Sequence, residues 1–167
     1  MHTKTKKIVI TALLAALTCV ATMIVHIPSP LHGYINLGDV IVLTSGFMLS
    51  PACGFLAAGV GSALADLLSG YVIYAPATFV IKGAMALVAF FVFRLLSRRT
   101  GKLPARILGG ILAEIVMVLG YLVFESFLYG FIPSLANVPA NAVQGAAGIL
   151  LGVPLAKVFE KANIITD

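Results

Sequence analysis

Charged residues are scarce in this sequence, and their scarcity limits the possible classes of protein. Only 10% of the 167 residues are charged, whereas about 25% of residues are charged in a typical soluble domain. Hydrophobic residues make up 60% of the chain. A water-soluble domain of this size has too little polar surface to cover so much apolar area, so we expect a membrane protein and exclude a soluble enzyme.

Tryptophan is absent, cysteine is rare, and the common catalytic motifs are missing. The two cysteines, Cys19 and Cys53, lie in apolar stretches and form no Cys-x-x-Cys pair. The sequence contains no phosphate-binding loop with Gly-Lys-Ser/Thr, no His-Glu-x-x-His motif and no serine nucleophile elbow. We therefore expect no catalytic activity, no metal site, no cofactor and no ATP hydrolysis by this chain.

Long apolar segments are present instead, and they predict an all-α integral membrane protein with six transmembrane helices. A spanning helix needs about 20 residues. The expected spans cover residues 8–27, 37–50, 51–68, 77–96 and 105–128, with a sixth that ends near Phe159. Residues 37–68 also fit one long helix, which would leave five spans, but Gly46, Pro51 and Gly54 favour a break. The whole chain, 1–167, is expected to form a single membrane-embedded domain.

Basic residues decide the expected orientation of these spans. Apart from Lys82, they gather at residues 4–7, 94–106 and 157–161. Six spans place all three groups on one side, which the positive-inside rule makes cytoplasmic together with both chain ends. The groups flank apolar segments, as membrane anchors do, so the net charge of +5 points to a lipid bilayer and not to nucleic acid.

Ionisable residues inside the predicted spans are costly and therefore point to function. Asp39, Asp66 and Glu125 are expected near the outer ends of their spans. Lys82 is expected in the outer third of its span, and Glu114 alone near mid-membrane. Polar side chains also share helix faces, because residues three or four positions apart are neighbours. Together these stripes predict an outward-opening polar pocket, with structural pairing, for example of Lys82 with Glu125, as the alternative. The predicted substrate-binding residues are Tyr34, Asn36, Tyr74, Thr78, Lys82, Tyr121, Glu125, Asn141 and Gln144.

Small residues form a second pattern, because they allow helices to approach closely. Ala57, Gly61 and Ala65 repeat every four residues, as do Gly148 and Gly152, and internal packing explains both sets. Ala12 and Ala16 lie on the first span, where they predict a docking face for another membrane subunit.

Four segments carry a resemblance to a known family. They are Tyr-Ile-Asn-Leu-Gly-Asp at 34–39, Ser-Pro at 50–51, Gly-Ser-Ala-Leu-Ala-Asp-Leu-Leu-Ser-Gly at 61–70, and Ala-Thr-Phe-Val-Ile-Lys-Gly at 77–83. In this order they resemble the substrate-binding S component of an energy-coupling factor (ECF) vitamin transporter, of the riboflavin, hydroxymethylpyrimidine or pyridoxine type. Ser50 departs from the family, in which glycine more often precedes the proline.

The resemblance implies a prokaryotic cell-membrane protein that captures a vitamin on its outer face. It implies a pocket formed by spans four to six and the first loop. It also implies docking through Ala12 and Ala16 to a transmembrane coupling subunit that carries two ATP-binding cassette ATPases.

The polar groups favour a small, flat, polar ligand, most simply pyridoxine or hydroxymethylpyrimidine, with riboflavin and pantothenate as alternatives. Such a ring needs both hydrogen-bond donors and acceptors, which Lys82, Glu125, Asn141 and Gln144 supply together. Two other functions remain open: a self-sufficient proton-coupled transporter that uses Glu114 or Asp66, and a scaffold without a ligand.

Overall fold

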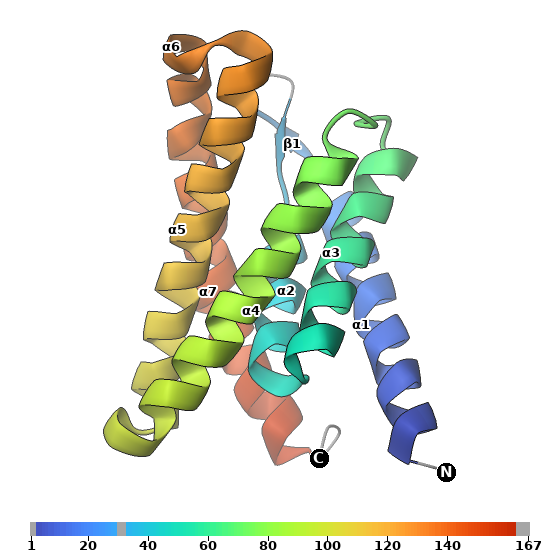
Figure 1. The fold of residues 1–167 in the computed structure, drawn as a ribbon, viewed down its shortest axis with the longest axis vertical. Helices are drawn as coiled ribbons and strands as arrows, with labels where there is room; N and C mark the ends of the chain where they lie inside the picture. The colour runs from blue at the N-terminus through green and yellow to red at the C-terminus, as the bar shows by residue number, and fades with distance from the viewer. Residues whose placement is uncertain (1–2, 30–32, 163–167) are drawn as a thin grey trace.

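Helices account for nearly all of the chain in the computed structural model, which describes residues 3–29 and 33–162 (Figure 1). The long helices are α1 (Thr3–Ile24), α3 (Pro51–Leu68), α4 (Ala75–Thr100), α5 (Lys102–Tyr129) and α7 (Val138–Lys161). Shorter elements are α2 (Gly38–Met48), α6 (Phe131–Ser134) and the 3₁₀ helix η1 (Leu135–Asn137). The strands β1 (Ile27–Pro28) and β2 (Tyr34–Ile35) pair antiparallel between α1 and α2.

Within the described residues, five helices are long and apolar enough to cross a membrane, and α2 is not one of them. With 11 residues, α2 is only about 16 Å long, roughly half of the hydrocarbon thickness. The predicted second span, 37–50, is therefore helical but too short to cross alone. Helix length by itself establishes five possible crossings, and the sixth remains a prediction.

The break between the second and third predicted spans lies where the sequence placed it. Helix α2 ends at Met48, Ser50 is extended, and Pro51 begins α3. Proline suits this first helical position because it has no amide hydrogen for the helix to satisfy. A second break is made by Gly101, whose positive φ of 87° separates α4 from α5.

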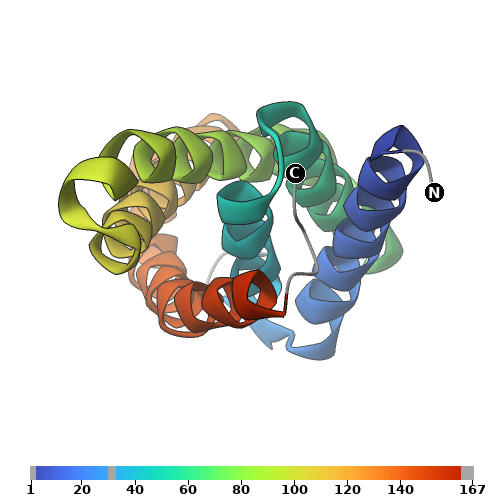
Figure 2. The ribbon, with the colours of Figure 1, turned by 90° about the horizontal axis from the view of Figure 1, so that it is seen from below.

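Helix α2 lies at the centre of the bundle, surrounded by the long helices (Figure 2). It packs against α1, α3, α4, α5 and α7, and all of its residues from Ile41 to Phe47 are buried. A helix segment that is buried on every side needs apolar or small residues all round, which explains why residues 41–47 include no charged or large polar side chain.

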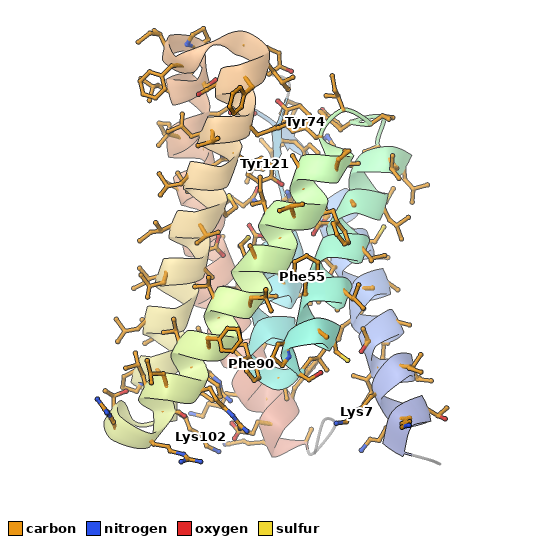
Figure 3. All side chains as sticks on the ribbon, viewed as in Figure 1. Lys7, Phe55, Tyr74, Phe90, Lys102 and Tyr121 are labelled. Atoms are coloured by element: carbon orange, nitrogen blue, oxygen red, sulfur yellow. The ribbon has the colours of Figure 1, made fainter. Side chains whose placement is uncertain are left out.

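The two ends of the bundle differ in charge. One end, called here the terminal end, contains the start of α1, the α4–α5 connection and the end of α7 (Figure 1). The opposite end, called the loop end, contains the α3–α4 and α5–α6 connections. The three groups of basic residues lie at the terminal end, where Lys7 and Lys102 are seen in Figure 3. Arg106 and Lys102 both pair with Glu160, which ties the start of α5 to the end of α7. The outermost residues, 1–2 and 163–167, lie outside the described residues.

The small residues on α3 and α7 serve internal packing, as predicted. Ala57 and Ala65 are fully buried, and a β-carbon added at Gly61 would lie 2.3 Å from the Ala15 carbonyl oxygen of α1. One at Gly152 would lie 3.0 Å from the Val40 carbonyl oxygen of α2. These contacts hold α1 and α7 close to their neighbours.

Candidate functional site

A cavity at the loop end is lined by many of the polar residues of the bundle. All nine residues that the sequence predicts for substrate binding line it. The other residues of its wall are Thr22, Ser29, Gly33, Ser62, Asp66, Tyr71 and Asn137. The cavity has a volume of about 40 Å³, which is roughly three water positions. The nine residues are thus brought together, and their binding of a substrate remains a prediction.

The hairpin between α1 and α2 forms one wall of this cavity and is attached to α7. The Asn36 backbone amide donates to Gln144 Oε1 at 2.9 Å, and the Asn36 side-chain amide donates to the same oxygen at 3.2 Å. Asn36 Oδ1 in turn accepts from the Gly38 amide at 2.9 Å. Asn36 therefore links the hairpin, the start of α2 and α7 in one network.

Gly38 allows this hairpin to lie deep in the bundle. A β-carbon at this position would lie 2.1 Å from the Thr22 hydroxyl oxygen and 2.9 Å from Asn36 Oδ1. Only glycine fits between α1 and the turn, so the start of α2 comes directly under the cavity.

A buried ion pair lies at the base of the cavity. The Lys82 ammonium group contacts Asp39 Oδ1, and Gln144 Nε2 donates to Asp39 Oδ2 at 2.6 Å. Both charged residues are almost completely buried. The Lys82 ammonium also lies 5.5 Å from the centre of the Tyr121 ring, within cation–π range. Structural pairing of Lys82 with Glu125 is therefore wrong: its partner is Asp39.

Asp39 lies in the first turn of α2, at the loop-end side of its predicted span as expected, but this helix begins deep in the bundle. Gly148 of α7 lies beside both Asp39 and Glu114: a β-carbon there would be 3.0 Å from Asp39 Cβ and 2.7 Å from Glu114 Oε1. Asp39 therefore shares the level of Glu114, and Glu114 is not alone in the interior. The reason is that the β1–β2 hairpin fills the loop-end part of the bundle between α1 and α2, so α2 begins well inside the bundle.

Glu125 faces the cavity from α5 and contacts two other elements. Its Oε1 atom accepts from Asn137 Nδ2 at 2.8 Å and from the Tyr74 hydroxyl at 3.5 Å. Burial raises the pKa of the Tyr74 hydroxyl, so this group stays neutral and available as a donor. Tyr74 and Tyr121 both lie in the loop-end half of the molecule in Figure 3.

Aromatic rings cover the side of the cavity next to α1 and α3. His26 stacks on Tyr34 with ring centres 3.8 Å apart, and Tyr71 lies 4.8 Å from Tyr34. The Tyr34 hydroxyl donates to Asp66 Oδ1 at 2.6 Å. These contacts join the hairpin to α3, and they give flat ligands a wall of ring faces and edges.

Sequence patterns missed several of the lining residues. Thr22, Ser62 and Asp66 come from α1 and α3, whereas the resemblance implied only spans four to six and the first loop. Asn137 does carry a sequence signal, because it lies four and seven positions before Asn141 and Gln144, which puts all three on one helix face. For Thr22 and Ser62 no sequence signal existed, because an isolated hydroxyl on an apolar helix commonly bonds to its own backbone.

Ala12 and Ala16 are exposed on α1, and neither of them lines the cavity. Within the described residues, no cluster of three or more His, Cys, Asp or Glu side chains has the geometry to hold a metal ion. The arrangement can enclose a small polar molecule and bind it through hydroxyl, amide, carboxyl and ring groups.

Comparisons with known proteins find relatives that match most of the chain. A family model described as ECF-type riboflavin transporter, S component, matches residues 2–161. An uncharacterised protein from Pyrococcus woesei is 38% identical over 143 residues, which cover 85% of this chain and 93% of that protein. The thiamine precursor transporter HmpT from Lactococcus lactis is 26% identical over 162 residues, covering 96% and 91% of the two chains.

Two solved structures share the fold. The S component of a bacterial ECF transporter superposes with a TM-score of 0.77 at 23% identity, covering 95% of this chain and 98% of that one. The S component for biotin from an ECF-type ABC transporter gives a TM-score of 0.62 at 21% identity, covering 96% and 95%.

Proposed function

Because the chain belongs to the family of ECF-type riboflavin transporter S components, we propose that it captures a vitamin precursor, hydroxymethylpyrimidine, in the loop-end cavity. Members of this family are multi-pass, substrate-binding transport proteins and not enzymes. The observation that carries the proposal is the convergence of all nine predicted polar and aromatic side chains on one cavity.

The choice of ligand rests on size and chemistry. A cavity of about three water positions suits one ring better than the three fused rings of riboflavin. Amide, hydroxyl and carboxyl groups on its walls match a ring with nitrogens, an amino group and a hydroxymethyl group. The relative named as a thiamine precursor transporter supports the same class. Pyridoxine is a similar ring and the next candidate, whereas the description of the family model favours riboflavin.

We further propose that the chain crosses a prokaryotic cell membrane six times with both ends in the cytoplasm. In this arrangement the hairpin and α2 together form the second crossing. The terminal end, with its basic residues, faces the cytoplasm, and the cavity opens to the outside.

Transport then needs partners that supply energy, since the sequence contains no ATP-binding motif. The exposed small face at Ala12 and Ala16 supports docking to a transmembrane coupling subunit that carries two ATP-binding cassette ATPases. A proton-coupled transporter that works alone is the competing function. Glu114 is its best candidate carrier, because both of its carboxyl oxygens are buried and neither has a hydrogen-bond partner among the described residues.

Two measurements test these proposals. Titration calorimetry of the purified chain with hydroxymethylpyrimidine, pyridoxine, riboflavin and pantothenate identifies the ligand, and we expect the first to bind most tightly. Uptake by proteoliposomes is then compared with and without the coupling subunit and ATPases. We expect uptake only with the partners and ATP, whereas uptake driven by a proton gradient in the chain alone would favour the secondary transporter.

A further inference from the structure

Two carboxyl groups in the wall of the cavity each have one oxygen that is paired and one that is not. Asp66 Oδ1 accepts from Tyr34, and Glu125 Oε1 accepts from Asn137. Asp66 Oδ2 and Glu125 Oε2 are buried and make no hydrogen bond of standard geometry within the described part of the chain, although the Thr78 hydroxyl also lies beside Asp66. The two residues are only 4% and 2% exposed, so bulk water does not reach most of either side chain.

A buried polar atom without a partner is destabilising, so these two oxygens need donors. The paired oxygens already receive the donors offered by Tyr34 and Asn137. Since both residues line the cavity, its occupant is in position to supply the missing hydrogen bonds.

The positive charge in the cavity wall is already engaged. Among the described residues of the wall, Lys82 is the only lysine or arginine, and its ammonium group is paired with Asp39 at the base. An anionic ligand would have to compete with Asp39 for Lys82 and would also face Asp66 and Glu125. The electrostatics of the site therefore disfavour a carboxylate on the ligand.

From these observations we infer that Asp66 and Glu125 select ligands that carry amino or hydroxyl donors and no negative charge. This inference rests on the proposed function, since it names the chemical feature that the same cavity recognises. The two residues lie on α3 and α5, with α4 packed between these helices, so the ligand presents donors on two of its edges. A ring amino group and a hydroxymethyl group on one pyrimidine meet this requirement.

The test uses three probes that differ in one group each. They are hydroxymethylpyrimidine with its ring amino group, an analogue with methyl in place of the amino group, and an analogue with carboxylate in place of hydroxymethyl. We expect the purified full-length chain to bind the first at least about tenfold more tightly than either analogue, because hydrogen bonds to charged groups are among the strongest. This comparison needs no variant, so it holds even where a substitution prevents folding.

Variants then assign the preference to residues. Glu125→Gln and Asp66→Asn keep the side-chain shape and remove the charge, and the double variant should reduce the amino-to-methyl preference to about twofold or less. Glu160→Gln is the matched control, because this acid lies at the terminal end and outside the cavity wall. It should retain the full preference even if it lowers the stability of the chain.

The outcomes separate the two proposals. Binding of the methyl or carboxylate analogue as tightly as the amino compound would overturn the inference and leave vitamin capture intact. A preference that survives in the folded double variant would also overturn it. If the wild-type chain binds none of the probes and none of riboflavin, pyridoxine or pantothenate, the proposed function fails and the inference fails with it.

Discussion

The ammonium group of Lys82 on α4 lies against the carboxyl group of Asp39 on α2, although the two residues are 43 positions apart in the sequence. Gln144 of α7 donates to the second oxygen of Asp39 and accepts from Asn36 of the hairpin connection. Three helices and the hairpin connection therefore meet at one buried polar centre beneath the cavity. Such a centre is stable only while every charge in it keeps its partner.

Replacing Asp39 with asparagine should destabilise the chain strongly. The substitution leaves the Lys82 ammonium buried without a counter-charge, which typically costs about 3–5 kcal/mol. Thermal unfolding in detergent, followed by circular dichroism, should show a large drop in melting temperature. The double variant with Lys82→Met should recover most of the loss, because both charges are then gone; an Asp39→Asn protein as stable as wild type would show that the pair is dispensable.

Asn141 and Gln144 should behave differently although they share a face of α7. Asn141 lines the cavity and is partly exposed, so Asn141→Ala should weaken ligand binding by about 1–3 kcal/mol and leave the melting temperature nearly unchanged. Gln144→Ala removes the hydrogen bonds to Asn36 and Asp39, so it should lower both the ligand affinity and the melting temperature. Equal effects of the two substitutions on melting temperature would contradict this division of roles.

Leucine at Ala12 or Ala16 should abolish uptake by the assembled transporter without changing ligand binding by the isolated chain. A bulky side chain prevents the close helix contact that the exposed small face allows. Ala146→Leu is the matched control, because this alanine is exposed on α7, away from the α1 face. Uptake assays and calorimetry on the same preparations check the prediction, and normal transport by both α1 variants would place the docking surface elsewhere.

Single cysteines should report the orientation of the bundle. In a background with Cys19→Ala and Cys53→Ala, Thr100→Cys lies at the terminal end and Ile132→Cys at the loop end. Both parent residues are exposed, Ile132 to 74%, whereas the nearby Ser134 is buried and unsuitable. A membrane-impermeant thiol reagent added to intact cells should label the Ile132 variant and spare the Thr100 variant. The opposite result would invert the topology and put the cavity on the cytoplasmic side.

Much of the candidate site was predictable from the sequence, because it lies on helix faces that spacing reveals. Asn141 and Gln144, Thr78 and Lys82, and Tyr121 and Glu125 each share a face at helical spacing, and all six line the cavity. Asp66 was recognised as a costly intramembrane acid but not assigned to the site. The sequence could not show that α3 brings it to the same cavity as Glu125, since that depends on how α3, α4 and α5 pack.

The sequence by itself determined the membrane setting and the approximate limits of the helices, because hydropathy and helical spacing are local properties of consecutive residues. It also determined the break at Pro51, since proline acts on its own backbone. Only the tertiary structure decided that α2 is short and central, that Asp39 lies deep in the bundle, and that Lys82 pairs with Asp39 and not with Glu125. These features depend on close approach between distant segments, such as Gly38 against Thr22, which no local pattern encodes.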